Sequence, residues 1–133
     1  GVLTIGSHSF NDCGKLESVS LPESLISIGA YAFSICIYLT KINIPEKVTL
    51  LSEYTFNCCQ RLKNISIPKM VASIGSFCFA YSGLTSIVIP DSISRILPST
   101  FRECKSLLSV SFPESIIEIR DNAFNYCNNL LSN

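Results

Sequence analysis

The sequence predicts a strand-rich solenoid of α/β type, built from about five and a half stacked units of 23 residues. Two series of residues predict it. Prolines recur at spacings of 23, 23, 22 and 23, and phenylalanines at 23, 23, 23, 22 and 23. Both series slip by one residue between Phe79 and Pro90, where a C-x-x-L segment shortens to Ser82-Gly83-Leu84. Because one deletion explains both slips, residues 1–133 are interpreted as a single repeat array. The anchors are Pro22, Pro45, Pro68, Pro90 and Pro113, and Phe10, Phe33, Phe56, Phe79, Phe101 and Phe124.

Each unit is expected to contain a strand, a turn, a second strand and one tight helical turn. Apolar and polar residues alternate in segments such as SVSL and KINI, which is strand periodicity, and proline then ends the strand. LISIG predicts the second short strand, and glycine (Gly6, Gly29, Gly75) is expected to permit a bend there. AYAFSIC is too short for an independent helix and predicts a single helical turn. Copies would stack with parallel strands about 4.8 Å apart.

Composition excludes several functional classes. The chain is 47% apolar and only 15% charged, with ten acidic and ten basic residues. No basic stripe suggests nucleic-acid binding, and no apolar run reaches the roughly 18 residues of a membrane span. The first residues, GVLTIGSHSF, lack the features expected of a signal peptide.

The consensus L-x-x-[VI]-x-I-P-x-x-[LVI]-x-x-I-G-x-x-A-F-x-x-C resembles the 23-residue leucine-rich repeats of the BspA-like family. The resemblance covers nearly the whole chain. It departs from the pattern where Leu51-Ser52, Ile96-Leu97 and Ile119-Arg120 replace Ile-Gly, and where Ser82 replaces the cysteine. The resemblance implies a right-handed leucine-rich-repeat solenoid without shared catalytic residues.

The resemblance also implies a role. Members are surface proteins of anaerobic bacteria and parasitic protists, connected with adhesion to host matrix proteins and to other cells. We therefore expect a non-enzymatic interaction or adhesion module without a cofactor, located at the cell surface or secreted, with a cytoplasmic location left open. Its partners would be host matrix or cell-surface proteins, or a glycan. The alternative is a structural spacer in a long surface protein, with no ligand of its own.

Five cysteines share one position, three residues after phenylalanine. A 23-residue spacing without histidine does not suit zinc, whereas stacked neighbours would lie within reach of a disulfide. A column of small buried thiols is the preferred interpretation. Cys78 occupies another small inward position. Cys58 precedes the column residue Cys59, in a variable position that is expected near the surface. The column comprises Cys13, Cys36, Cys59, Cys104 and Cys127.

The outward positions of the first strand form the candidate ligand-binding face. It is small, polar and nearly uncharged, so it is either a simply solvated sheet face or a hydrogen-bonding surface for protein or glycan. In a leucine-rich-repeat horseshoe this face is concave. Asn64-Ile65-Ser66 is also a glycosylation sequon. The ten residues are Ser18, Ser20, Lys41, Asn43, Asn64, Ser66, Ser86, Val88, Ser109 and Ser111.

Two further repeat positions are expected to form rows along the solenoid. A row that leans aromatic is expected to pack partly beneath the turns or to form an adhesive stripe: His8, Tyr31, Tyr54, Phe77, Ser99 and Asn122. A rim row that is mostly acidic is expected to be a solvated edge: Glu23, Glu46, Lys69, Asp91 and Glu114. Both terminal units are expected to expose core side chains and strand edges, which would favour self-association.

Overall fold

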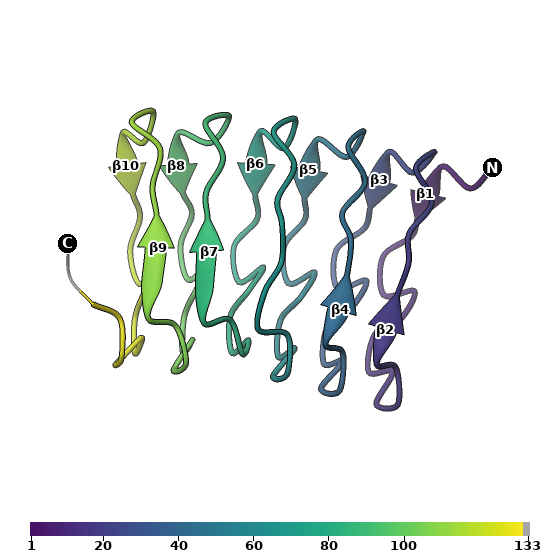
Figure 1. Cartoon of the computed structure of the whole chain (residues 1–133), viewed down its shortest axis with the longest axis horizontal. Coiled ribbons are helices and arrows are strands. Elements are labelled where there is room, and N and C mark those ends of the chain that lie inside the picture. The colour runs from purple at the N-terminus through teal and green to yellow at the C-terminus, as the bar shows by residue number, and fades with distance from the viewer. Residues whose placement is uncertain (132–133) are drawn as a thin grey trace.

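The computed structural model describes residues 1–131 as a stack of short coils along one axis, with the chain ends at opposite ends of the stack (Figure 1). Ten strands form two rows. The front row contains β2 (Ser18–Val19), β4 (Lys41–Ile42), β7 (Ser86–Val88) and β9 (Ser109–Ser111). The back row contains β1 (Thr4–Ile5), β3 (Ser27–Ile28), β5 (Leu50–Leu51), β6 (Ser73–Ile74), β8 (Arg95–Ile96) and β10 (Glu118–Ile119).

Neighbouring strands pair in parallel, in the register that the repeat predicts. Thr4 pairs with Ser27 and Ser18 with Lys41, each 23 residues apart. The inward residues of these strands fill a continuous core together with a column of stacked phenylalanine rings. The predicted solenoid with parallel strands is therefore confirmed.

The predicted helical turn is wrong, because no residue between 1 and 131 is helical. Each coil instead contains successive reverse turns, and we call these segments the turn row: residues 6–13, 29–36, 52–59, 75–82, 97–104 and 120–127. In the third coil, N–H groups of Thr55, Asn57 and Cys59 donate to carbonyls three residues earlier, at 3.4, 3.1 and 3.2 Å. Tyr54 and Cys58 have φ of 59° and 63°, as the third residue of a type II turn requires.

Because of the left-handed residues, alternate N–H groups of the turn row donate hydrogen bonds to the next coil instead of to their own coil. The N–H groups of Tyr54, Phe56 and Cys58 donate to the carbonyls of residues 76, 78 and 80 in the following coil, at 3.1, 2.9 and 2.8 Å. A helix would keep these bonds within one coil. Positive φ costs a residue with a side chain roughly 1–2 kcal/mol. The hydrogen bonds between coils offset that cost, and the turn row becomes a third bonded side of the solenoid.

Glycine serves close packing in this fold, and the expectation that it supplies a special bend is wrong. No glycine of the described chain has positive φ. A Cβ added to Gly29 would lie 2.4 Å from the backbone nitrogen of Ser7, and one added to Gly75 would lie 2.4 Å from that of Glu53. The missing side chain therefore lets adjacent coils approach.

Both rows of strands break near the one-residue deletion. The back row pairs in the order β1-β3-β5-β6, and β8 and β10 form a separate sheet. In the front row, β2 pairs only with β4 and β7 only with β9 among the described residues. Residues 64–67, between these pairs, form no strand and make no backbone hydrogen bond within residues 1–131. We call these two interruptions together the seam.

The turn row continues across the seam and holds the array together there. Phe79 N–H donates to the Thr100 carbonyl at 3.0 Å, and Tyr81 N–H donates to the Arg102 carbonyl at 2.8 Å. The two blocks of paired strands are therefore joined by the turn row, by the shared core and by a few bonds on the other sides, such as Thr85 N–H to the Lys63 carbonyl at 3.0 Å.

The terminal coils are less covered than the middle ones, as expected. Phe10 is 39% exposed and Phe56 is 0% exposed, although both occupy the same repeat position. Ile119, in the last coil, is 51% exposed, and its counterpart Ile74 is 2% exposed. Self-association through these ends stays a prediction.

Candidate functional site

The front row places the ten candidate binding residues on one exposed side of the solenoid, which we call the polar face. The alternation of strand side chains explains the placement, since the residues between them point into the core. Ile42 and Ile87, for example, are 7% and 4% exposed. The polar face contains Ser18, Ser20, Lys41, Asn43, Asn64, Ser66, Ser86, Val88, Ser109 and Ser111.

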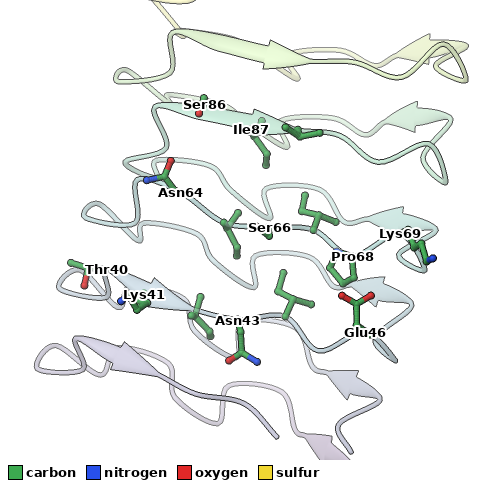
Figure 2. A pocket seen from close by; sticks show the side chains of 15 residues that line it. Thr40, Lys41, Asn43, Glu46, Asn64, Ser66, Pro68, Lys69, Ser86 and Ile87 are labelled. Carbon is green, nitrogen blue, oxygen red and sulfur yellow. The ribbon is translucent and has the colours of Figure 1, made fainter. Parts of the chain in front are cut away.

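A hollow of about 910 Å³ lies over the polar face where the front row is interrupted (Figure 2). Its floor includes Ile65 and Ile67, which are half-buried, whereas their counterparts in neighbouring coils are buried. Residues 64–67 also line this hollow, and their backbone groups have no backbone hydrogen-bond partner in the described chain. The hollow therefore combines apolar side chains with polar groups that hold no intramolecular bond.

Charged side chains flank the hollow. Lys41 belongs to the predicted face, whereas Glu46 and Lys69 belong to the predicted rim row. The structure brings all three to one hollow, together with the amide of Asn64 and the hydroxyls of Ser66 and Ser86. Sequence spacing alone missed this because the rim and the face are different repeat positions. The remaining rim residues, Glu23, Asp91 and Glu114, are exposed.

Asn43 differs from the other residues of the polar face because its side chain is already engaged. Its amide oxygen accepts a hydrogen bond from Leu21 N–H at 2.7 Å, and its amide nitrogen donates to the Leu21 carbonyl at 3.0 Å. This pair extends the β2–β4 ladder by one residue through a side chain. Asn43 is therefore a structural residue of the face, and one N–H and one oxygen lone pair of its amide are already used.

The structure places the column cysteines under the turn row and gives their thiols a specific partner. The Sγ atoms of Cys36, Cys59 and Cys104 donate to phenylalanine carbonyls of the preceding coil, at 3.1, 3.1 and 3.0 Å. Cys127 repeats the contact at 2.9 Å, and Cys13 lies half-buried in the first coil. Each thiol thus joins two coils. In the shortened coil, the Ser82 hydroxyl lies 3.4 Å from the Cys104 thiol instead.

Burial makes the interior thiols poor nucleophiles. It raises the pKa of Cys78 from its usual 9.0 to about 12, against a smaller opposing effect of backbone hydrogen bonds. Burial also raises the pKa of Cys59 well above its usual value. Cys58 is half-buried at a left-handed position, and partial burial raises its pKa as well. The two adjacent cysteines therefore lie in different environments.

The repeats of this sequence match the model of a known protein family. Residues 3–131 match the BspA type leucine rich repeat region, in 6 copies. The chain belongs to the BspA-type leucine-rich repeat family. The predicted resemblance is therefore confirmed, and proteins of this family and fold are typically non-catalytic.

Solved structures share the fold of this BspA-type array. A leucine-rich repeat protein from Bacteroides ovatus is 32% identical with a TM-score of 0.89, and the match covers 97% of this chain and 40% of that one. The Treponema pallidum leucine-rich repeat protein TpLRR is 33% identical with a TM-score of 0.94, covering 98% and 61%. A leucine-rich cell surface protein from Faecalibacterium prausnitzii is 28% identical with a TM-score of 0.61, covering 95% and 43%.

The BspA-type array thus spans less than two thirds of the length of each of these structures. No curated protein matches the chain significantly.

The aromatic row of the BspA-type array is a ladder of stacked rings. His8, Tyr31, Tyr54 and Phe77 stack with centroid separations of 4.6, 4.6 and 4.7 Å. Because each inner ring has both faces covered by neighbours, only ring edges face outward along the ladder. The row continues with buried Ser99 and exposed Asn122. The stacked geometry agrees with the expectation that this row packs partly beneath the turns. An adhesive role for the row stays a prediction.

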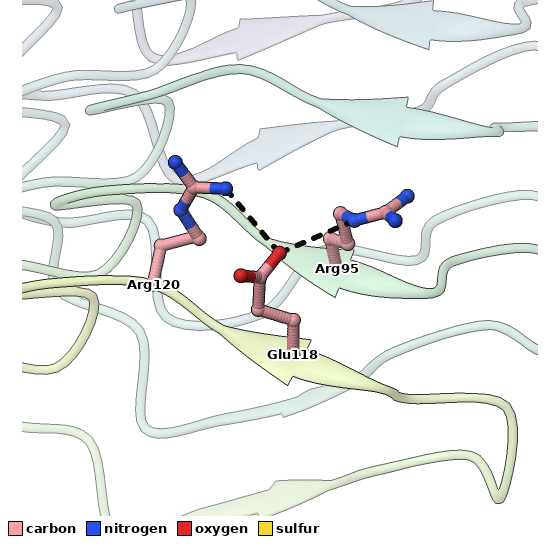
Figure 3. A network of polar contacts seen from close by, with 3 residues as sticks. All are labelled: Arg95, Glu118 and Arg120. Atoms are coloured by element: carbon pink, nitrogen blue, oxygen red, sulfur yellow. Dashed lines mark hydrogen bonds and ion pairs between the residues drawn. The ribbon is translucent and has the colours of Figure 1, made fainter.

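The back of the BspA-type array carries a small ionic network (Figure 3). Glu118 accepts from Arg95 at 3.2 Å and from Arg120 at 3.3 Å. All three side chains are about half exposed, so these ion pairs contribute little to stability. Within residues 1–131, no group of His, Cys, Asp and Glu could hold a metal ion, and no helix is long and apolar enough to cross a membrane.

Proposed function

We propose that this BspA-type array is a non-catalytic protein-interaction module displayed at the cell surface, with the hollow of the polar face as its docking site. The hollow of about 910 Å³ over the seam is the observation that carries the proposal. The Faecalibacterium prausnitzii relative, named as a cell surface protein, supports the location.

The docking mechanism is rigid display. Lys41, Lys69 and Glu46 supply charges of both signs at the edges of the hollow, and Asn64 supplies an amide between them. The floor residues Ile65 and Ile67 offer apolar area for a partner side chain to cover. Interfaces of this kind combine an apolar centre with a polar rim. The paired strands on both sides keep these groups in place before the partner arrives, which lowers the entropic cost of binding.

The test is adhesion of the purified array to host matrix proteins. Beads coated with the array are applied to immobilised collagen, fibronectin, fibrinogen and laminin, and bound beads are counted. A variant combining Lys41→Ala, Asn64→Ala and Lys69→Ala removes the polar groups of the hollow. We expect adhesion to fall at least about tenfold, since hot-spot truncations each cost more than about 1 kcal/mol.

The matched control combines Arg95→Ala and Arg120→Ala on the back of the array, where the same kind of charge is removed far from the hollow. We expect this control to adhere like the unmodified array. Equal adhesion of the hollow variant and the unmodified array would instead favour the structural spacer. Adhesion lost only after enzymatic removal of glycans from the immobilised proteins would identify a glycan partner.

Asn64 adds a condition to this proposal. It is exposed at the hollow and belongs to the sequon Asn64-Ile65-Ser66. In a host cell that glycosylates sequons, a glycan at Asn64 would occupy the docking site. The array used in the adhesion assay should therefore be produced in bacteria.

A further inference from the structure

The deletion removes one residue from the flank of the solenoid. Between each column cysteine and the next core leucine, the other complete coils carry two residues, such as Gln60-Arg61 and Lys105-Ser106. The shortened coil carries Gly83 alone. A hollow of about 270 Å³ lies at this point, and we call it the notch. Its lining is Gln60, Tyr81, Ser82, Gly83, Glu103, Lys105 and Ser106.

The floor of the notch is fixed by close backbone packing. Gly83 is buried, and its N–H donates to the Cys59 carbonyl at 3.1 Å. A Cβ at this position would lie 2.1 Å from the carbonyl oxygen of Gln60, so no other residue fits without moving the backbone. The notch therefore follows from the covalent length of the coil and does not depend on the rotamer of one side chain.

The walls of the notch carry side chains with unused hydrogen-bonding capacity. The side chains of Gln60, Glu103 and Lys105 make no hydrogen bond and no salt bridge within residues 1–131, while each forms part of the lining. They supply an amide, a carboxylate and an ammonium group, and Ser106 adds a hydroxyl. Glu103 and Lys105 balance each other in charge, so the site favours a neutral ligand with many hydroxyl groups.

The rim of the notch adds an aromatic surface. Tyr81 lines the notch and is 40% exposed, at a left-handed position with φ of 60°. Unlike the inner members of the aromatic row, its ring stacks on no other ring of the described chain, so it has ring surface to offer a ligand. The volume lies just below the roughly 300–1,000 Å³ typical of pockets for drug-sized ligands, which suits one small ring.

We propose that the notch binds one neutral sugar residue at the end or branch of a polysaccharide. The C–H face of the sugar would pack on Tyr81, while its hydroxyls bond to Gln60, Glu103 and Lys105. This site lies on the flank of the array, apart from the hollow of the polar face, because Gln60 and Lys105 belong to the segments before the front-row strands. It therefore stands independently of the protein-docking function proposed above.

The experiment is a titration of the isotopically labelled array with free monosaccharides, followed by amide NMR shifts. Glucose, galactose, mannose, fucose, N-acetylglucosamine and N-acetylgalactosamine are the probes. We expect at least one to shift the amides of Tyr81, Gly83 and Lys105 in a saturable way. Tyr81→Ala should weaken the binding roughly two- to tenfold, the range for loss of an aromatic contact. Tyr126→Ala, at the same repeat position two coils later, should leave the binding unchanged.

A second variant fills the notch but keeps Tyr81 and the side chains of Gln60, Glu103 and Lys105. The dipeptide Ser82-Gly83 is replaced by the tripeptide Cys-Lys-Ser, copied from the next coil, which restores the 23-residue spacing. We expect this variant to lose the sugar-dependent shifts and to keep the remainder of its spectrum. If it fails to fold, the Tyr81 and Tyr126 variants decide the question. The proposal is wrong if no sugar shifts the three amides, if shifts appear only elsewhere, or if the filled variant binds equally well.

Discussion

Gly29 and Gly14 differ in what a side chain would meet at each position. A Cβ at Gly29 would lie 2.4 Å from backbone of the preceding coil, whereas one at Gly14 would meet no atom within 4 Å. Neither glycine has positive φ. We therefore expect Gly29→Ala to destabilise the array by about 1–3 kcal/mol through overpacking. Gly14→Ala should be neutral or stabilising by up to about 1 kcal/mol. Urea unfolding of both variants measures this, and equal effects would contradict it.

The adjacent cysteines should differ in reactivity towards a thiol reagent. Cys59 is 0% exposed and its Sγ is bonded to the Phe33 carbonyl, whereas Cys58 is half-buried. Because thiolate access controls alkylation, we expect iodoacetamide to label Cys58 before Cys59 in the folded array. Mass spectrometry of partly labelled protein reads the order directly. Labelling of Cys59 first would overturn the assignment of the column.

Cys78 should make stability fall at alkaline pH. Its folded pKa of about 12 lies above its usual 9.0, so the neutral thiol is favoured in the folded state. The stability linked to this group is complete below about pH 9 and is lost as the pH rises towards 12, by up to about 4 kcal/mol. Urea midpoints measured between these limits test this. Cys78→Ala, which copies the residue found at Ala32 and Ala123, should show a weaker decline.

At the scale of elements, the interrupted front row predicts uneven hydrogen exchange. Residues 64–67 make no backbone hydrogen bond within the described chain, whereas Ile89 N–H donates to the Ser111 carbonyl and Leu108 N–H to the Thr85 carbonyl, both at 2.9 Å. Exchange of a native amide requires loss of its protecting hydrogen bond. We expect the amides of residues 64–67 to exchange at least about tenfold faster than those of Ile89 and Leu108. Equal protection, measured by NMR, would show that the front row is continuous.

The positions of the strands and core residues in each repeat could be predicted from the sequence. Each position holds a residue type that strongly favours one kind of environment. Phenylalanine at Phe33 and Phe56 predicts the core, and proline predicts the end of the first strand. The turn row could not be read in this way. Its left-handed positions hold Tyr31, Ile35 and Cys58, residue types that disfavour positive φ when alone. Only hydrogen bonds to the next coil make that geometry favourable, and a single sequence does not show them.

The candidate site was predictable in part for a similar reason. The period of two identified the outward residues of the front row. Asn43 bonds to Leu21, and Lys69 lines the hollow. Both contacts depend on the packing of adjacent coils, which the sequence does not show. The deletion before Leu84 was visible in the sequence. The notch that it leaves, and the seam near it, depend on how adjacent coils pair and could not be read from spacing.

At the scale of the whole molecule, the terminal coils predict self-association of the array as an isolated chain. Phe10 and Ile119 expose apolar surface that their counterparts bury, and β1 and β10 each pair on one side only. Unpaired edges and open repeat ends are aggregation sites. We expect the scattering mass to rise with concentration. Ile117→Lys and Ile119→Lys together should reduce the rise, and a constant monomer mass in the unmodified array would contradict the prediction.

The seam gives the array a preferred point of failure under tension. With the adhesive role at the cell surface proposed above, the array would be pulled along its length by flowing liquid. In this solenoid the strands of both rows are unpaired near one boundary. The turn row and a few other bonds, such as Thr85 N–H to the Lys63 carbonyl, cross it. A stretching force would therefore part the two blocks there first and leave each block intact. The solenoid would thus extend at the seam, close to the position of the missing residue.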